Sequence, residues 1–352
     1  MGAPAEQTVR LTALSPGAGC ACKLPAAKLE GLFAALGPAV APASGDLLVG
    51  AAEGDDAAVL RLDDERALVL TTDFFTPIVD DPYDWGRVAA TNALSDVYAM
   101  GGRPLIAVNL AAWPGDDLPV ELLGEVLRGG ADAAAAGGCV VVGGHTISDP
   151  VPKYGMAVVG MADPGRLFAI DRVAAGDHLV LTKAVGTGVV STAVKRGAAS
   201  PEVVAAAVAS MTTLNASASE AALAAGVRAA TDVTGFGLLG HLHRMARAGG
   251  LAAEIDASAV PLLPGALDLA AAGLVPGGTR ANTSHLAGAV TVADTVPPEL
   301  AVLLHDAQTS GGLLLAVPDD PADLVSALRA HGLPAAVVGR AIEGEPGHIA
   351  VR

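Results

Sequence analysis

Acidic residues occupy positions where the surrounding sequence is apolar or rich in glycine. The run Glu53-Gly54-Asp55-Asp56 stands just before an apolar strand pattern, and Asp73 stands at the exit of the next one. Asp96 lies within an otherwise apolar helix pattern, where an unpaired buried charge is costly, and Asp232 precedes a glycine-rich stretch. Each alone also fits a turn, a helix cap or a solvated surface. Together they predict an oxygen-rich site for a hard cation, because Mg²⁺ takes few carboxylates and binds substrate phosphates.

A second feature is the glycine pair in Gly143-Gly144-His145-Thr146, which follows the strand pattern 139–142. Glycines allow backbone N–H groups to approach an anion closely, and the hydroxyl and imidazole can hydrogen-bond to it. The alternative is a plain glycine turn with an exposed histidine. The stretch is therefore a candidate anion contact.

The third feature is Cys20-Ala21-Cys22-Lys23. A thiol beside an ammonium group favours the thiolate, which is the reactive form. A structural zinc site is excluded, because only Cys139 remains as a further cysteine and such sites use four ligands. The alternative is an inert N-terminal tail.

Nucleotide-binding motifs give a weaker signal. The sequence contains no GxxxxGK[ST] phosphate-binding loop, but a GxGxxG pattern occurs at Gly235, Gly237 and Gly240. Asp232 lies three residues before the first of these glycines, where its charge would repel a pyrophosphate unless a cation lay between them. The simpler interpretation, which we favour over a dinucleotide site, is that Asp232 caps a helix entered through glycines.

The elements that must position these residues follow from hydrophobic periodicity. The first half predicts a hairpin, two helices and three more strands; the strands are 57–62, 67–72, 105–110 (buried), 139–142 and 154–161, and the helices are 84–100 and 118–136. Turn residues cluster at 163–177, which is the predicted domain boundary. The second half predicts strands 178–182, 251–255, 312–317 and 335–338, and helices 187–195, 202–211, 213–225, 235–248 and 321–331. Helices mixed with hairpins indicate an α+β or mixed α/β class.

Composition limits the possible functions. A chain of 352 residues predicts about two domains, and 52% hydrophobic with 16% charged residues excludes intrinsic disorder. Every long apolar run ends well short of the roughly 18 residues that a membrane span needs, so we expect a soluble protein without a membrane partner. The formal net charge of −16 disfavours nucleic acid as a partner. Three cysteines and the absence of a signal-peptide pattern indicate a reducing cytoplasm.

Five segments occur in order over nearly the whole chain: SPGAGCACK, GDDAAV, TTDFFTPIVDDPYDWGRVAATNALSDVYAMGG, GGHT and TDVTGFGLLGH. This series closely resembles the selenophosphate synthetase family, also called selenide, water dikinases. That family lies within the aminoimidazole ribonucleotide synthetase (PurM-like) superfamily, which includes thiamine monophosphate kinase and a hydrogenase maturation protein. The cysteine–lysine segment near the N-terminus distinguishes the selenium enzymes from these relatives.

The resemblance implies roles for the residues that match the family's motifs. Cys20, which is selenocysteine in some members, matches the catalytic residue, and Lys23 matches an essential lysine that contacts the ATP phosphates. The implied magnesium ligands are Asp56, Asp96 and Asp232. The implied nucleotide-site residues are Lys23, Glu53, Gly54, Asp55, Asp73 and Asp96, together with Gly144, His145 and Thr146 reaching the nucleotide of the partner subunit. A site completed in this way implies a homodimer.

The resemblance also implies a two-domain PurM-like fold. We expect a flexible glycine-rich segment at 1–44, an N-terminal mixed α/β domain with the ATP site at 45–170, and a C-terminal α+β domain at 171–352. The implied reaction converts ATP, hydrogen selenide and water to selenophosphate, AMP and orthophosphate, which supplies activated selenium for selenocysteine and selenouridine synthesis. Two alternatives stay open: another ATP-dependent enzyme of the superfamily that forms ADP, and a catalytically silent protein that binds selenium or a metal.

Overall fold

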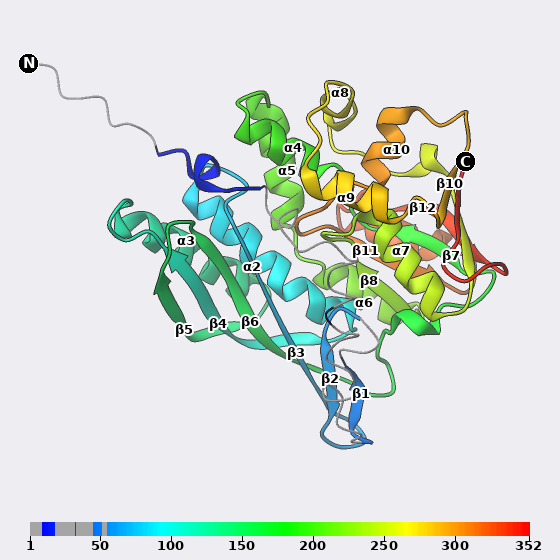
Figure 1. Ribbon diagram of the computed structural model, residues 1–352. Coiled ribbons are helices and arrows are strands. Elements are labelled where there is room, and N and C mark those ends of the chain that lie inside the picture. Colours follow the sequence, from blue (N-terminus) through cyan, green and yellow to red (C-terminus); the bar gives the residue numbers. More distant parts are fainter. Residues whose placement is uncertain (1–8, 18–31, 33–44, 51–54) are drawn as a thin grey trace, which may run out of the picture.

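Two β-sheets organise the chain in the computed structural model, which describes residues 9–17, 32, 45–50 and 55–352. The first sheet is formed by residues up to 162 and the second by residues from 178 onward, and helix α2 (Pro82–Ala99) packs between them (Figure 1). Between the sheets, the predicted boundary segment 163–177 contains the short 3-10 helix η4 (Ile170–Arg172). The mixed α/β prediction for the fold is confirmed.

The first sheet has the strand order β1-β2-β3-β6-β4-β5. Its strands are β1 (Leu47–Val49), β2 (Ala58–Arg61), β3 (Ala67–Phe75), β4 (Arg103–Trp113), β5 (Val140–Ser148) and β6 (Lys153–Ala162). Strands β2 and β3 form the predicted antiparallel hairpin. Strands β4 and β5 pair in parallel, with α3 (Val120–Ala136) as the connection between them. The other neighbours in this sheet pair antiparallel.

Local sequence explains where α2 begins and ends. Asp81 accepts a hydrogen bond from the backbone N–H of Asp84 at 2.8 Å, and Pro82 occupies the first helical position, where its missing N–H costs nothing. The helix ends before Gly101, whose φ of +71° suits glycine. All but a few side chains of α2 are buried, because the sheet covers one side and the second domain covers another. This helix is therefore the central packing element.

Glycines let α2 and α3 approach closely. A Cβ atom on Gly86 of α2 would lie 2.0 Å from the carbonyl oxygen of Val126 on α3, and one on Gly129 would lie 2.1 Å from the carbonyl oxygen of Tyr83. No side chain fits at such distances, so the two backbones touch where these glycines lie.

We expect Gly86→Ala to lower the free energy of unfolding by about 1–3 kcal/mol, because the added methyl group forces the two helices apart. Gly124→Ala is the matched control, since Gly124 lies in α3 with no atom within 4 Å of the place that a methyl group would take. That variant should gain roughly 0.5–1 kcal/mol from lower chain entropy. Urea unfolding of both variants checks this; equal midpoints would contradict the close packing.

Hydrogen bonds tie α2 to the second domain. The amide nitrogen of Asn215 donates to Ser95 Oγ at 2.8 Å, and Ser219 Oγ donates to the carbonyl oxygen of Tyr98 at 2.8 Å. Near the helix centre, the backbone N–H of Ser310 donates to Asn92 Oδ1, also at 2.8 Å. These bonds are buried, so they hold the two domains in one relative orientation.

The second sheet has the order β10-β13-β9-β12-β7-β11-β8. Its strands are β7 (His178–Leu181), β8 (Ala229–Asp232), β9 (Ala252–Ile255), β10 (Val290–Val292), β11 (Leu313–Val317), β12 (Ala336–Ile342) and β13 (Ile349–Val351). From β8 to β9 the neighbours are antiparallel, and β13 and β10 then add in parallel. The remaining helices are α4 (Thr187–Lys195), α5 (Pro201–Thr212), α6 (Ala216–Ala224), α7 (Gly237–Ala248), η5 (Ala257–Ala259), α8 (Ala266–Ala271), α9 (Gly277–His285), α10 (Pro298–Leu304) and α11 (Ala322–Ala330).

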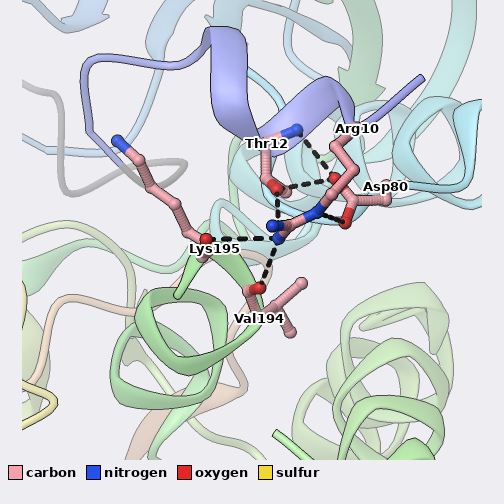
Figure 2. A network of polar contacts seen from close by, with 5 residues as sticks. All are labelled: Arg10, Thr12, Asp80, Val194 and Lys195. Atoms are coloured by element: carbon pink, nitrogen blue, oxygen red, sulfur yellow. Dashed lines mark hydrogen bonds and ion pairs between the residues drawn. The ribbon is translucent and has the colours of Figure 1, made fainter. Parts of the chain in front are cut away.

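The 3-10 helix η1 (Leu11–Leu14) is anchored to both domains, as Figure 2 shows. The guanidinium group of Arg10 donates to the carbonyl oxygens of Val194 and Lys195 at 2.9 and 3.2 Å, at the C-terminal end of α4. The same group pairs with Asp80, in the loop before α2, and the hydroxyl and backbone N–H of Thr12 donate to that carboxylate at 2.6 and 2.9 Å. Residues 10–14 are thereby held across the domain junction.

In the first sheet, the structure corrects the extent predicted for one strand and the burial predicted for another. The strand predicted at 139–142 continues as β5 through Ser148, so the glycine stretch lies within a strand and not in a turn. The pairing of β4 with β5 changes register between Ala107 and Val108: Ala107 is opposite Val141, whereas Val108 is opposite Gly143, whose φ is +155°. This irregularity in the pairing allows the strand to continue past the glycines. The strand predicted as buried at 105–110 belongs to β4, which alternates buried and exposed residues because helices cover only one face of the sheet.

Within the described residues, no helix is both long and apolar enough to cross a membrane.

Candidate active site

The predicted site residues divide into those that the structure describes and those that it does not. Cys20, Lys23, Glu53 and Gly54 lie outside the described residues. The others come from five places: the turn before β2, strand β3, helix α2, strand β5 and the end of strand β8. They are Asp55, Asp56, Asp73, Asp96, Gly144, His145, Thr146 and Asp232.

Asp56 and Asp232 meet at the junction of the two domains. The hydroxyl of Thr231 donates to Asp56 Oδ1 at 3.0 Å, and the backbone N–H of Asp232 lies 3.4 Å from Asp56 Oδ2. Asp232 is 1% exposed, and Asp56 is partly buried. Burial, followed by repulsion from Asp232, Asp55 and Asp96, raises the pKa of Asp56 well above its usual range. Negative charge is therefore concentrated here by side chains from both halves of the chain.

Asp96 on helix α2 lies close to this group because one face of α2 packs against one face of strand β3. Residues two apart on a strand share one face, as do residues four apart on a helix. Accordingly Thr71 and Asp73 on β3 face Asp96 and Asn92 on α2: the Thr71 hydroxyl donates to Asp96 Oδ2, and the Asn92 amide donates to Asp73 Oδ2 at 2.6 Å. The prediction that Asp73 lies at a strand exit is wrong, since it lies inside β3 with its side chain turned toward α2.

Asp55 is held in a different way from its neighbour Asp56. Its Oδ2 accepts from the backbone N–H of Ile170 at 3.1 Å and its Oδ1 from that of Asp56 at 3.0 Å. Burial raises the pKa of Asp55 to about 6, while these hydrogen bonds and the positive charge of Arg244 on α7 act in the opposite direction. Asp55 thus links the turn before β2 to the boundary segment 163–177 between the two domains.

The donor set suits a hard divalent cation. Among the residues described, no group of three or more His, Cys, Asp or Glu side chains is arranged so that it could hold a metal ion. Carboxylates of Asp56, Asp96 and Asp232 nevertheless lie close enough for their repulsion to raise the pKa of Asp56. A cation relieves that repulsion, and Mg²⁺ needs only one or two carboxylates because it keeps waters and binds phosphate oxygens. Asp56, with Asp96 and Asp232 in electrostatic range of it, therefore offers carboxylate oxygens of the kind that a magnesium ion takes when a polyphosphate supplies further ligands.

On the second-domain side of the junction, the buried side chain of Lys183 donates hydrogen bonds to two backbone carbonyl groups. The ammonium group of Lys183 donates to the carbonyl oxygens of Thr213 and Ser310 at 2.6 and 3.0 Å. Burial lowers its pKa to about 7, against which the charge of Asp232 acts. Ser310 adopts a left-handed conformation (φ 49°) and its N–H holds Asn92, which in turn holds Asp73. This chain of contacts connects the second sheet to the predicted nucleotide-site aspartate.

Gly144, His145 and Thr146 do not join the aspartates of the same chain. They lie in β5, at the edge of the first sheet, and two strands, β6 and β4, separate β5 from β3. At about 4.8 Å per strand, this places β5 roughly 14 Å from β3. His145 is exposed. Gly144 has a structural reason to be glycine, since a Cβ there would lie 2.5 Å from the carbonyl oxygen of Asn109 on β4.

The GxGxxG pattern does not form a dinucleotide site, and Asp232 does not cap a helix. Asp232 is the last residue of β8, and α7 begins at Gly237 without a side-chain cap. A dinucleotide fold needs neighbouring parallel strands on either side of this helix, whereas three strands separate β8 from β9. Packing accounts for the glycines, because a Cβ on Gly237 would lie 2.6 Å from the carbonyl oxygen of His305.

Sequence reasoning missed the neutral partners of the acidic residues. Each is close to a predicted aspartate in sequence: Thr71 is two residues before Asp73, and Thr231 directly precedes Asp232. Asn92 lies one helical turn before Asp96. Their spacing is a usable signal, since a hydroxyl or amide on the same face as a buried carboxylate is well placed to hold it.

Comparison with known proteins defines first the class and then the family. Two family models match, AIR synthase related protein, N-terminal domain, at residues 54–162 and AIR synthase related protein, C-terminal domain, at 174–352. The hydrogenase maturation protein HypE, in a crystal structure in complex with ATP, has a similar fold with a TM-score of 0.61 and 20% sequence identity, covering 88% of this chain and 87% of that one. The chain therefore has the two-domain fold of the AIR synthase related proteins.

Within that class, sequence identity is much higher to one group. The selenide, water dikinase of Porphyromonas gingivalis is 47% identical over 330 residues, which is 93% of each chain. The selenide, water dikinase of Myxococcus xanthus is 45% identical over 346 residues, which is 97% of each. The chain belongs to the selenide, water dikinase family, and the resemblance seen in the sequence motifs is confirmed.

Proposed function

We propose that this chain is an enzyme that converts ATP, hydrogen selenide and water to selenophosphate, AMP and orthophosphate. The observation that carries the proposal is the identity of 45–47% with selenide, water dikinases over nearly the whole chain. The junction site supports it, because Asp96 from the first domain and Asp232 from the second both lie within electrostatic range of Asp56. Transfer of two phosphoryl groups from one nucleotide requires concentrated charge compensation, which carboxylate-held cations provide.

In this proposal Asp56, Asp96 and Asp232 hold Mg²⁺, which when bound neutralises charge on the polyphosphate. Asp55, Asp73, Glu53 and Gly54 line the nucleotide site. Lys23 contacts the phosphates and stabilises charge that develops on the transferring group. Cys20 presents selenium, since a thiolate is a soft nucleophile that suits this element.

The nucleotide product tests this function against its two alternatives. Protein, Mg²⁺ and ATP are incubated anaerobically with and without selenide, and the nucleotides are separated by anion-exchange chromatography. Selenide-dependent AMP supports the proposed reaction. ADP as the product would indicate a different ATP-dependent enzyme of the same superfamily, and no ATP consumption would indicate a protein that only binds selenium or a metal.

We also propose a homodimer in which the first sheets of two copies pack together. Helices cover one face of this sheet, and the opposite face is apolar: Leu70, Val159, Ile106 and Val140 are paired across β3, β6, β4 and β5 in one continuous row. Three of these side chains are 44–60% exposed. An apolar row of this length is unusual on a solvent-facing sheet, and a second copy would cover it and its edge strand.

The position of the glycine stretch favours the same arrangement. Gly144, His145 and Thr146 lie on the edge strand β5, away from the carboxylates of their own chain. In the proposed dimer they contact the nucleotide of the partner subunit. Each site is then incomplete without the second copy.

Mixing two inactive variants tests the shared site. Asp96→Asn removes a carboxylate and His145→Ala removes the contact proposed to act in trans. A heterodimer of the two carries both defects in one site and none in the other, so an equimolar mixture should regain about a quarter of wild-type activity after complete exchange of subunits. Selenide-dependent AMP formation measures the recovery. No recovery, with exchange demonstrated and both parents inactive, would refute the shared site.

We propose the cytoplasm as the location. Selenide and a thiolate at Cys20 both require reducing conditions, which this compartment maintains.

A further inference from the structure

Asp56 receives a hydrogen bond from the second domain through one hydroxyl group. Thr231 lies in β8 next to Asp232 and is 3% exposed. Its Oγ1 lies 3.0 Å from Asp56 Oδ1. A hydroxyl has a single proton, so the direction in which Thr231 donates decides whether it supports the negative charge of Asp56.

His241 fixes that direction. It lies in the second turn of α7, is 4% exposed, and packs against the ring of Phe236 with the ring centroids 5.5 Å apart. The backbone N–H of Thr234 lies 3.1 Å from His241 Nε2. A backbone N–H can only donate, so Nε2 is the acceptor and carries no proton. The ring proton is therefore on Nδ1.

The proton on Nδ1 faces Thr231. His241 Nδ1 and Thr231 Oγ1 are 3.4 Å apart, so the imidazole donates to the hydroxyl oxygen. The hydroxyl proton is then directed outward, toward Asp56 Oδ1 at 3.0 Å, with the carbonyl oxygen of Asp232 at 3.3 Å as the weaker acceptor. The donors run in one sequence, from the Thr234 N–H through the imidazole and the hydroxyl to the carboxylate.

We infer that Thr231 and His241 are positioning residues that orient the Asp56 carboxylate toward a divalent cation shared with Asp96 and Asp232. The inference rests on the proposed cation site. Oδ1 of Asp56 is held by the hydroxyl, which fixes the rotation of the carboxyl group. A carboxylate fixed in this way loses less conformational entropy when a cation binds, and partners of this kind commonly affect metal affinity about 10–100-fold.

The matched pair Thr231→Val and Thr231→Ser tests this role. Valine has the same shape as threonine without the hydroxyl, whereas serine retains the hydroxyl. The measurement is Mn²⁺ affinity, followed by electron paramagnetic resonance in the presence of a saturating non-hydrolysable ATP analogue. We expect Thr231→Val to weaken Mn²⁺ binding roughly 10-fold or more and Thr231→Ser to stay within about twofold of wild type.

Substitutions at His241 extend the test. His241→Phe keeps an aromatic ring packed against Phe236 but removes both nitrogens, and we expect it to weaken Mn²⁺ binding as Thr231→Val does. His241→Asn places an amide donor near the position of Nδ1 and should recover part of the affinity. Because His241→Phe removes the acceptor for the Thr234 N–H, the melting temperature of this variant without metal is measured as well. If the variant does not fold, the comparison of Thr231→Val with Thr231→Ser alone tests the inference.

Two results would overturn the inference, and they differ in what else they affect. Equal Mn²⁺ affinity in Thr231→Val, Thr231→Ser and wild type would show that the hydroxyl only packs, and the cation site would stand. Asp232→Asn is the reference for the site itself. If that variant also binds Mn²⁺ like wild type, the cation site is refuted together with the positioning role.

Discussion

Asp232→Asn is expected to reduce selenophosphate formation on the order of 100-fold or more while the fold stays intact. The substitution removes one charge at the domain junction and almost no volume. In the protein without metal, it removes repulsion with Asp56 and also attraction to Lys183. These two effects on stability have opposite signs, so the melting temperature should change little. Circular dichroism and the selenide-dependent assay measure both quantities on the same sample.

Asp256→Asn is the matched control. Asp256 accepts from the backbone N–H of Ser258 at 3.0 Å and so caps the 3-10 helix η5 in the same domain. Asparagine caps almost as well as aspartate, so activity should be unchanged. If Asp232→Asn were as active as this control, the proposed metal role of Asp232 would be wrong.

The second large effect is expected at the N-terminal cysteine. Cys20→Ser retains size and hydrogen bonding but raises the pKa of the group and removes the polarisable sulfur. It should abolish selenophosphate formation. The affinity for ATP should stay within about twofold of wild type, because in the proposal Lys23 and the cation held by the aspartates bind the ATP phosphates, and Cys20 does not. Lys23→Met should behave differently and weaken the handling of the phosphates themselves. Equilibrium binding of an ATP analogue, combined with product analysis, separates the two roles.

Cys139→Ala controls for loss of a thiol in general. Cys139 is buried just before β5 and takes no part in the junction site, so this variant should turn over normally. Selenide-dependent turnover in Cys20→Ser equal to that of Cys139→Ala would show that the Cys20 thiol is dispensable.

How far the sequence predicts the structure depends on the length and period of each pattern. The helix predicted at 187–195 has those bounds, and the one at 84–100 differs by one or two residues, because apolar residues at helical spacing mark both. Asp81 and Pro82 also mark the start of α2, whereas α4 begins after Gly186 without a side-chain cap. Strands β1, β10 and β13 and helices α8, α9 and α10 escape prediction from the sequence. They are short, and long-range pairing or packing stabilises them more than local propensity does. The strand predicted at 139–142 is shorter than β5 because glycines usually end strands, whereas here an irregularity in register absorbs them.

The candidate site shows the same limit. The aspartates stand out because a charge in an apolar pattern is unusual, and Asp96 and Asp232 both lie within electrostatic range of Asp56. No local pattern could show that Thr231 is the residue that contacts Asp56, 175 positions earlier. Contacts between residues so far apart in the sequence depend on how the two domains dock. The docking depends on how α2 packs against both domains, which no single segment of the sequence shows.

Phosphorus NMR of the protein with Mg²⁺, ATP and selenide under anaerobic, reducing conditions tests the proposed reaction most directly. It resolves ATP, ADP, AMP, orthophosphate and a phosphorus–selenium species in one spectrum. The proposed reaction predicts selenophosphate, AMP and orthophosphate in equal amounts, formed only when selenide is present, with coupling to selenium-77 on the new phosphorus signal. Accumulation of ADP as the final nucleotide, or ATP loss without a phosphorus–selenium signal, would contradict it.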